Sequence, residues 1–385
     1  MLYYKTMNNK VGIERCGAYD PEKLYQALKA ASHAAGFPQE ARAQSLFAGK
    51  TVLLKPNILM DAPPEKAVTT HPAFLAACIR LVREWGASRI LVGDSPGLQG
   101  PNFTAKVSGL GEEAVKNGAE WADFTRDKME LDCPDGIVQG RFTVSGVLKE
   151  ADLVISLPKL KTHQLMYLTG AMKNLFGLVP SIAKSPYHVR YSSRESFAAM
   201  IVDLNLAVKP AFAFMDAVTA MEGPGPAGGS PKQAGLVLAS SNLLAMDAAA
   251  SAIIGYPPEK IPVNRDALTR KVWLKDFAEI EYPSLKPEEV KVHDFVKVPF
   301  KKSGSQLLDF VLPKPLRKLR EAKIPHPVID HKICARCGDC IRICASEAMK
   351  LAVEENSKQV EIDYKRCIRC YCCHEICRYK AITVS

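Results

Sequence analysis

The C-terminal part of the chain carries eight cysteines in two copies of one spacing. The first copy is Cys334, Cys337, Cys340 and Cys344, and the second is Cys367, Cys370, Cys373 and Cys377. Both copies read C-x2-C-x2-C-x3-C, which is a spacing that binds [4Fe–4S] clusters. Three thiolates two residues apart let one tight loop reach three corners of a cubane, whereas the fourth cysteine enters the next short helix and points away. The pattern therefore predicts two clusters.

Each predicted cluster takes its fourth ligand from the other copy. We define the first cysteine set as Cys334, Cys337, Cys340 and Cys377, and the second cysteine set as Cys367, Cys370, Cys373 and Cys344. Disulfides and zinc are the alternatives, but no export segment and no histidine at a zinc-ligand spacing accompany the cysteines. Cys372, next to a predicted ligand, is interpreted as a packed thiol.

Length and charge suggest three parts. A chain of 385 residues is long for one core, so we expect a body over 1–300, a linker over 301–327 and a cluster domain over 328–385. The net charge is +10, and Lys297 to Lys323 holds eight basic residues against Asp309 and Glu321. Pro313 and Pro315 prevent the linker from forming one helix.

The basic linker could bind nucleic acid or an anionic membrane. No aromatic-interleaved pattern accompanies it, so nucleic acid is unlikely on this sequence, and we favour a solvated linker that docks acidic electron-carrier proteins. No apolar run approaches the length of a membrane helix, and the start, MLYYKTMNNK, has no apolar export segment. We expect a cytoplasmic, reducing and anaerobic setting. The oligomeric state cannot be inferred.

The body alternates short apolar strands with helical patterns. Strands are predicted at Thr51–Leu54, Arg89–Val92, Ala151–Leu157 and Ala211–Val218, with a helix from about Pro72 to Trp85 that Thr70 caps. This alternation predicts an α/β fold with a largely parallel sheet and helices on both faces. A small α+β domain is expected to hold the clusters.

Ligands of open parallel sheets collect beyond the carboxyl ends of the strands. The polar residues at those predicted ends are Lys55 and Asn57; Asp94 and Ser95; Lys159, Lys161, Thr162 and His163; and Asp216 with Glu222. Lys159, Lys161 and His163 alternate, so in an extended segment their side chains point the same way. Lys173 and Asn174 follow on a predicted helix. Gathered cations suit a small anion such as a carboxylate or phosphate.

Two candidate site residues, His71 and Asp94, also have purely structural interpretations. His71 precedes Pro72 at a strand-to-helix connection, where a histidine is as often a helix-start partner as a catalyst. Asp94 precedes Ser95-Pro96-Gly97 and could simply cap a turn. No phosphate-binding glycine motif is present, which argues against ordinary ATP or NAD binding. The lysines could also be surface charges that flank a strand.

The motifs resemble known families. The stretches Lys55-Pro56-Asn57, Thr70-His71-Pro72 and Gly93-Asp94-Ser95, the run ADLVISLPKLKTHQLMYLTGAMKNLFG and the segment from Met221 are similar to domain of unknown function three-six-two. Residues 328–385 resemble a bacterial two-cluster ferredoxin. The order of strand, histidine, glycine and lysine within 152–184 is faintly similar to nickel-pincer lactate racemases, which implies a metal-cofactor isomerase as a lower alternative.

The functional prediction is an iron–sulfur oxidoreductase. Two [4Fe–4S] clusters would pass low-potential electrons to a small anionic substrate or bound cofactor in the crevice, and a flavin or further metal is left open. Lys161, His163, Lys173 and His71 are the predicted catalytic residues, with a proton from His163 or His71. Lys55, Asn57, Asp94, Ser95, Lys159, Asn174 and Glu222 are the predicted binding residues. The alternative is a non-enzymatic electron-transfer or reductive-activation protein that docks to another enzyme; an RNA-binding protein ranks last.

Overall fold

The computed structural model describes residues 7–37, 45–98, 100, 102–300, 324–354 and 357–385. Its principal helices are α2 (Pro21–Ala34), α4 (Pro72–Glu84), α5 (Leu110–Lys116), α6 (Ala171–Asn174), α7 (Ser181–Arg190), α8 (Arg194–Val208), α9 (Leu243–Ile253), α10 (Pro262–Thr269), α13 (Asp339–Arg342) and α14 (Cys372–Ile376). Most of the predicted linker, residues 301–323, lies outside the described residues.

The body is organised by one large sheet, whose strands run in the order β1-β11-β10-β7-β2-β3-β4. Their bounds are β1 (Gly12–Arg15), β2 (Thr51–Pro56), β3 (Arg89–Val92), β4 (Glu120–Trp121), β7 (Leu153–Leu157), β10 (Phe212–Glu222) and β11 (Ser230–Ser240). The strands β10, β7, β2, β3 and β4 are parallel to one another, and β11 is antiparallel to both of its neighbours, β10 and β1. The predicted largely parallel α/β sheet is confirmed.

A short continuation of the sheet carries the Lys-Leu-Lys-Thr-His run. The strand β8 (Lys159–His163) follows β7 after Pro158 and pairs in parallel with β10, and β9 (Tyr167–Leu168) turns back on it. A separate two-stranded sheet, β5 (Lys128–Asp132) and β6 (Arg141–Ser145), covers part of the body. Because β8 extends beyond the end of β7, its side chains lie at the carboxyl edge of the sheet.

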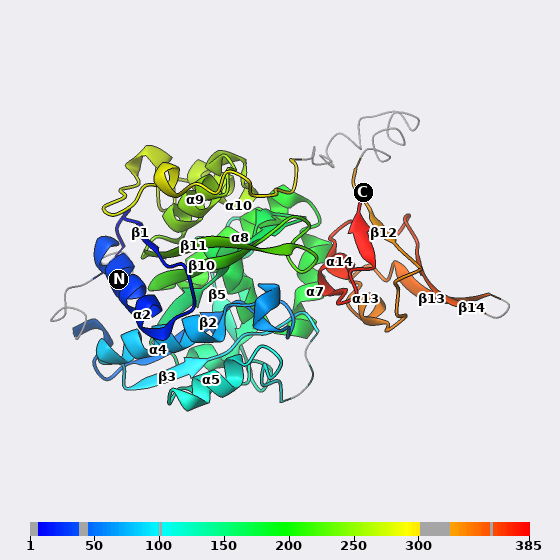
Figure 1. Cartoon of the computed structure of the whole chain (residues 1–385). Helices are drawn as coiled ribbons and strands as arrows, with labels where there is room; N and C mark the ends of the chain where they lie inside the picture. Colours follow the sequence, from blue (N-terminus) through cyan, green and yellow to red (C-terminus); the bar gives the residue numbers. More distant parts are fainter. Residues whose placement is uncertain (1–6, 38–44, 99, 101, 301–323, 355–356) are drawn as a thin grey trace.

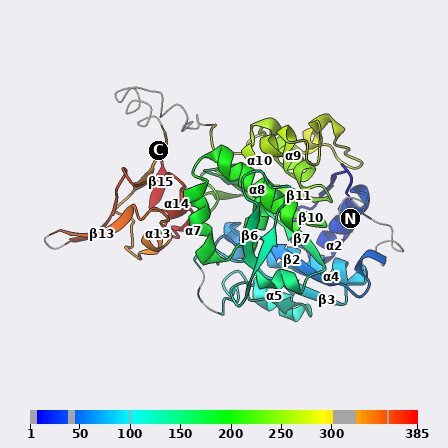
Figure 2. The ribbon, with the colours of Figure 1, turned by 180° about the vertical axis from the view of Figure 1, so that it is seen from behind.

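Helices cover both faces of the sheet, as the alternation of strand residues requires. Along β2, Leu53 packs into one apolar cluster with α8 and α9, whereas Val52 and Leu54 pack into another with α2 and α4. Figures 1 and 2 show these helix layers from the two sides of the body. Helices on both faces are therefore confirmed.

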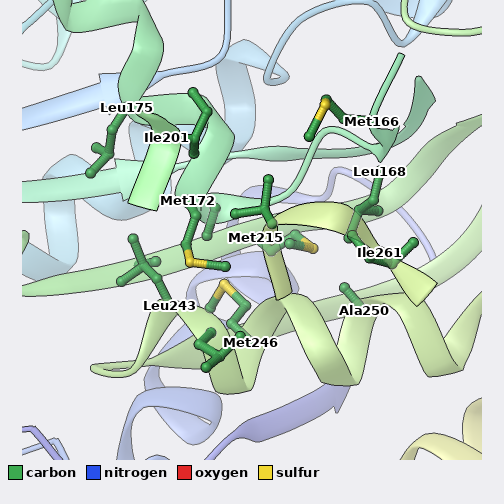
Figure 3. Packing of buried hydrophobic residues seen from close by; sticks show 14 of the residues in the cluster. Met166, Leu168, Met172, Leu175, Ile201, Met215, Leu243, Met246, Ala250 and Ile261 are labelled. Atoms are coloured by element: carbon green, nitrogen blue, oxygen red, sulfur yellow. The ribbon is translucent and has the colours of Figure 1, made fainter. Parts of the chain in front are cut away.

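The larger of the two apolar clusters lies between the sheet and the helices α6, α8 and α9. Figure 3 shows Met172 beside Met246 and Met215, with Leu175 and Ile201 above them in this view. All five of these side chains are fully buried. Since α6 is only one turn long, its position depends on this packing, and α6 carries Lys173 and Asn174.

The C-terminal residues form a small region with β12 (Pro327–Ile329), β13 (Met349–Glu354), β14 (Ser357–Ile362) and β15 (Ile382–Val384), besides α13 and α14. Figures 1 and 2 both place this region at one end of the body, with α14 beside α7 and the β13–β14 hairpin projecting outward. No helix among the described residues is long and apolar enough to cross a membrane.

Several element boundaries differ from the prediction. The helix α4 is capped by His71, whose Nδ1 accepts a hydrogen bond from Ala73 N at 3.1 Å. The predicted cap, Thr70, instead donates its hydroxyl to Leu157 O at 2.7 Å, so it ties the helix start to β7. The strand β10 continues to Glu222, four residues beyond its predicted end, because β11 pairs with it along this length.

Candidate functional site

A cavity of about 100 Å³ lies at the carboxyl ends of β2 and β3. The body supplies one wall and the C-terminal region the other. Its lining is Asn57, Ile58, Leu59, Asp94, Ser95, Gly97, Thr169, Lys173, Asn174, Phe176, Gly177, Lys184, Ser185, His188, Ile343, Cys372, Glu375 and Ile376. Because β2, β3, α6, α7 and α14 all end or begin here, the cavity joins segments that are far apart in the sequence. We call it the shared cavity.

A buried ion pair forms one side of the shared cavity. Lys55 Nζ lies 2.7 Å from Asp94 Oδ1, and the two side chains are 0% and 3% exposed. Asp94 also accepts hydrogen bonds from Ile58 N at 2.6 Å and Ser95 N at 2.8 Å. Burial lowers the pKa of Lys55, and the charge of Asp94 opposes that shift. The paired strand ends β2 and β3 are thus joined by a desolvated charge pair.

An amide network extends from this pair to α6. Asn174 Oδ1 accepts from Lys55 Nζ at 3.3 Å and from Asn57 Nδ2 at 3.1 Å, and its Nδ2 donates to Lys55 O at 3.1 Å. The start of α6 is fixed by Asp247, which accepts from Ala171 N at 2.5 Å and from the next backbone amide, that of residue 172, at 3.0 Å. Together these contacts determine where the neighbouring Lys173 side chain can reach.

Two lysines line the shared cavity. Lys173 has no ion-pair partner within 4 Å among the described residues, and its pKa is lowered by burial, an effect that the charge of Glu375 opposes. Lys184, on α7, donates to Ser95 O. Burial lowers the pKa of Lys184 to about 7. A lysine ammonium that has lost hydration in this way is stabilised more by a bound anion than a surface lysine is.

Several polar atoms around the shared cavity have no hydrogen-bond partner among the described residues. They include the hydroxyls of Ser95 and Thr169, which are 2% and 4% exposed, and Asn57 Oδ1. Buried hydroxyls are usually paired with protein or with water. Their clustering on one cavity is what a site that holds a polar ligand or water requires.

Lys161 and His163 lie behind the shared cavity rather than on its surface. Lys161 Nζ donates to Val68 O at 2.6 Å, and burial lowers its pKa to about 7. His163 Nδ1 accepts from Leu165 N at 3.1 Å, and burial holds its pKa well below the usual value. The other nitrogen, Nε2, lies 3.2 Å from Oε1 of Glu375, although neither atom makes a hydrogen bond in this arrangement.

Glu375 connects Lys161 and His163 to the C-terminal region. It projects from α14 with a side chain that is 13% exposed, and burial raises its pKa while the charges of Lys173, His374 and Lys161 lower it. A second contact comes from His374, whose Nε2 lies 3.1 Å from Pro224 O. The packing of α14 on the body therefore buries charged groups from both α14 and the body.

Lys159 and His71 belong to a separate cluster around Asp216. Lys159 Nζ lies 2.8 Å from Asp216 Oδ2 and donates to Tyr19 OH at 2.7 Å. Asp216 also accepts from His71 N at 2.9 Å, and the ring of His71 stacks on Tyr19 with centroids 3.6 Å apart. Burial lowers the pKa of His71 to about 4. None of these four residues lines the shared cavity, since their polar atoms are directed at one another.

Glu222 is also apart from the shared cavity. Its Oε2 accepts from Val296 N at 2.8 Å at the end of β10. Of the predicted site residues, the structure thus brings Asn57, Asp94, Ser95, Lys173 and Asn174 to one cavity, with Lys55, Lys161 and His163 directly behind. The predicted single row of Lys159, Lys161 and His163 is divided, because Asp216 holds its first member.

The first cysteine set surrounds a second, smaller cavity. Cys334, Cys337, Cys340 and Cys377 all line it, with Arg336 and Tyr379 at its edge. Burial raises the pKa of Cys340 to about 11, and the charges of the other three thiols add to that shift. Four thiols converging on one cavity are the donor set that a [4Fe–4S] cluster requires, so these residues fit the group.

The second cysteine set includes Cys370, which packs in an apolar cluster with Met60 and Leu98 of the body. Burial raises the pKa of Cys373 far above its usual value, and the charges of Cys370, Cys367, Cys340 and Cys344 add to it. Among the described residues, no three His, Cys, Asp or Glu side chains are arranged to hold a single metal ion. A cubane differs from that arrangement, because each thiolate binds a different iron. None of the twelve cysteines, all of which lie in described ranges, forms a disulfide.

The polar and thiol residues of the shared cavity that sequence reasoning missed are Thr169, Lys184, Ser185, His188, Cys372 and Glu375. Lys184 lies on α7 in a run without strong helical periodicity, so no pattern pointed to it. Glu375 lies between the cluster cysteines, where attention falls on the thiols. Cys372 is packed, as predicted, but against the shared cavity.

Comparisons with known proteins find similar proteins. A curated protein, the "Thylakoid-associated protein sll1697" of Synechocystis sp., is 29% identical over 313 residues, which cover 81% of this chain and 93% of that protein. The solved lactate racemase apoprotein of Thermoanaerobacterium thermosaccharolyticum matches 55% of this chain and 51% of its own with a TM-score of 0.39 and 12% identity, so the chain spans about half of that enzyme. The model of the domain of unknown function DUF362 matches residues 52–252, more than half of the chain, and the chain belongs to this family.

Proposed function

We propose that this protein is an iron–sulfur oxidoreductase that acts on a small anionic substrate or bound cofactor in the shared cavity. The observation that carries the proposal is the composition of that cavity. Its body wall holds the polar ends of β2 and β3, and its other wall is α14, which contains Cys372 between the ligand candidates Cys370 and Cys373. A redox group held there would lie against the substrate.

The first and second cysteine sets would each hold one [4Fe–4S] cluster, with the fourth thiol exchanged between the two copies. When bound, these clusters would supply one-electron transfer at low potential. The first set includes the exposed Cys337, whereas Cys370 of the second set packs in an apolar cluster with Met60 and Leu98 of the body. The second set is therefore the one nearer to the substrate in this proposal.

The residues of the body would bind and orient the anion. Lys173 and Lys184 supply positive charge, and Asn57, Asn174 and the Ser95 hydroxyl supply polar contacts. Ile343, Ile376 and Phe176 exclude water, which strengthens those interactions. His163 contacts Glu375, which lines the cavity, and we assign proton transfer to His163. His71, which caps α4 in the Asp216 cluster, is the less suitable of the two predicted proton donors.

The proposal is tested by chemical reduction of the anaerobically purified chain. Its reoxidation by candidate small anions is followed in the visible spectrum, with Lys173→Met and Lys116→Met as matched variants. Lys116 is a suitable control because its side chain is 72% exposed and far from the shared cavity. We expect Lys173→Met to slow reoxidation by at least tenfold and Lys116→Met to leave it unchanged. Equal rates in all three proteins would refute the enzyme proposal.

A non-enzymatic electron-transfer or reductive-activation protein is the second candidate. The surface around the first cysteine set favours it, because Ile333 and Tyr379 are 51% and 47% exposed there, and Lys332 and Arg336 are exposed beside them. An acidic redox partner protein would suit such a surface. A nickel-pincer isomerase and a flavin or further metal stay predictions, as does a cytoplasmic location. The name of the Synechocystis relative places that protein at thylakoids.

A further inference from the structure

The shared cavity carries more positive charge than its own carboxylates can neutralise. Lys173 and Lys184 line it, and Lys55 and Lys161 lie directly behind. Against these four cations stand two carboxylates, Asp94 and Glu375. The neighbouring histidines do not add to the count, because burial lowers the pKa of His188 to about 3 and that of His163 well below its usual value.

We propose that the ligand of the shared cavity is a small dianion, bound between Lys173 and Lys184. This inference rests on the proposed function only in taking the shared cavity as the substrate site. With all four lysines protonated the cavity has two positive charges in excess, and a ligand with two negative charges neutralises them. Before binding the excess is about one charge, because Lys161 and Lys184 are each about half protonated at pH 7, so a dianion is the ligand that balances the site as it draws in a proton.

Unpaired hydrogen-bond donors point to the same class of ligand. The hydroxyls of Ser95 and Thr169 line the cavity without a partner among the described residues, although both residues are at least nine-tenths buried. They would donate to anionic oxygens, as would the two lysines. The acceptor Asn57 Oδ1, which belongs to a lining residue, would take a ligand hydroxyl or a water.

The size of the shared cavity limits the ligand further. A volume of about 100 Å³ holds several waters or one compact molecule. A short dicarboxylate or a phosphate group meets both the charge and the size. A nucleotide is too large for this volume.

Binding of a dianion should be coupled to proton uptake. Burial lowers the pKa of Lys161 and of Lys184 to about 7, so each is about half protonated at pH 7. The charged groups that act on Lys184 are Asp94, Lys55 and Lys173, and those on Lys161 are Lys173, Glu375, Lys159 and Asp94. A bound dianion adds negative charge and raises both pKa values. Two half-protonated lysines would together take up about one proton per ligand.

Isothermal titration calorimetry of the anaerobically purified full chain at pH 7 tests the proposal. The probes are malonate, inorganic phosphate and acetate, each titrated in two buffers of different ionisation enthalpy so that proton uptake is measured. We expect malonate or phosphate to bind at least tenfold more tightly than acetate, with a net uptake of about one proton for malonate and less for phosphate, because the phosphate monoanion loses its own proton when it binds as the dianion. Tighter binding of malonate would indicate a dicarboxylate, and tighter binding of phosphate a phosphate group.

Variants distinguish the cavity from general anion attraction. Lys184→Met should weaken dianion binding at least tenfold and halve the proton uptake, whereas Lys116→Met should change neither. Ser95→Ala, which keeps all charges, should weaken binding severalfold without changing the proton uptake. The proposal is overturned if acetate binds as tightly as the dianions, if no probe binds, or if Lys184→Met behaves as Lys116→Met. These results leave the iron content and reducibility of the chain untouched, so the proposed redox function is judged separately.

Discussion

The ion pair between Lys55 and Asp94 gives the sharpest test of how the cavity wall is held. Lys55→Met keeps the length of the side chain and removes its charge, which leaves Asp94 buried without its cation. Removing one partner of a buried pair costs about 3–5 kcal/mol of the free energy of unfolding. Asp94 keeps two backbone donors, Ile58 N and Ser95 N, so we expect the lower end, about 3 kcal/mol.

The same strand offers a matched control. Lys50, just before β2, pairs with Asp152 at 3.3 Å, but these side chains are 46% and 42% exposed. Asp152 likewise keeps a backbone donor, Thr51 N at 2.8 Å. Because water screens this pair, Lys50→Met should cost less than about 1 kcal/mol. The two substitutions therefore remove the same charge from two ends of one strand that differ in burial.

Urea unfolding followed by tryptophan fluorescence measures both variants. All three tryptophans, Trp85, Trp121 and Trp273, lie in the body, so the signal reports on the sheet rather than on the cluster region. The free energy of unfolding is expected to fall by about 3 kcal/mol per M urea. Lys55→Met should therefore lower the urea concentration at the unfolding midpoint by about 1 M, and Lys50→Met by less than about 0.3 M. Asp94→Asn should cost much less in the Lys55→Met protein than in the wild type. Equal midpoints for Lys55→Met and Lys50→Met would refute the reasoning.

Three further predictions concern neighbouring positions. A Cβ on Gly177 would overlap the Asp94 carboxylate and meet Lys55 Nζ, so Gly177→Ala should cost about 1–3 kcal/mol in the same urea assay, whereas Gly140→Ala, with open space around it, should cost little. Burial raises the pKa of Asp247 to about 7, so the folded state holds a proton that the unfolded chain has lost between pH 4 and 7. Asp247 therefore makes the free energy of unfolding fall as the pH rises across that window, by up to about 1.4 kcal/mol per pH unit. The difference in the free energy of unfolding between the wild type and Asp247→Asn should show this fall and become flat above pH 7. A difference that is flat at every pH would contradict the prediction. Cys372→Ser should leave the iron content unchanged, whereas Cys370→Ser should lower it by about one cluster; an equal loss in both would mean that Cys372 is a ligand.

Much of the fold follows from local patterns. The strands Thr51–Pro56 and Arg89–Val92 are short apolar runs, and each is followed by a helix, so their parallel order could be predicted. The exact residue that caps α4 could not be predicted. Thr70 and His71 are both able to accept a helix amide, and the choice was made by Leu157 O, which takes the Thr70 hydroxyl and belongs to a strand far along the chain.

The candidate site was predicted in part for the same reason. Asp94, Ser95, Lys173 and Asn174 lie at strand ends or on the segment after one, where parallel sheets gather ligands. The separation of Lys159 from Lys161 depends on Asp216 and Tyr19, two partners that no spacing connects to β8. Lys184 and Glu375 were missed because each becomes part of the cavity only through tertiary docking, of α7 in one case and α14 in the other.

The central claim is that the two cysteine sets hold redox clusters beside an anion cavity, and its most direct test is a native mass spectrum of the anaerobically purified full chain with iron and sulfide analysis. The account predicts about eight irons and eight sulfides per chain, four of each per cluster, falling by about half in Cys337→Ser and in Cys370→Ser. A chain that carries no iron when purified without oxygen, or that carries zinc on the same thiols, would contradict it.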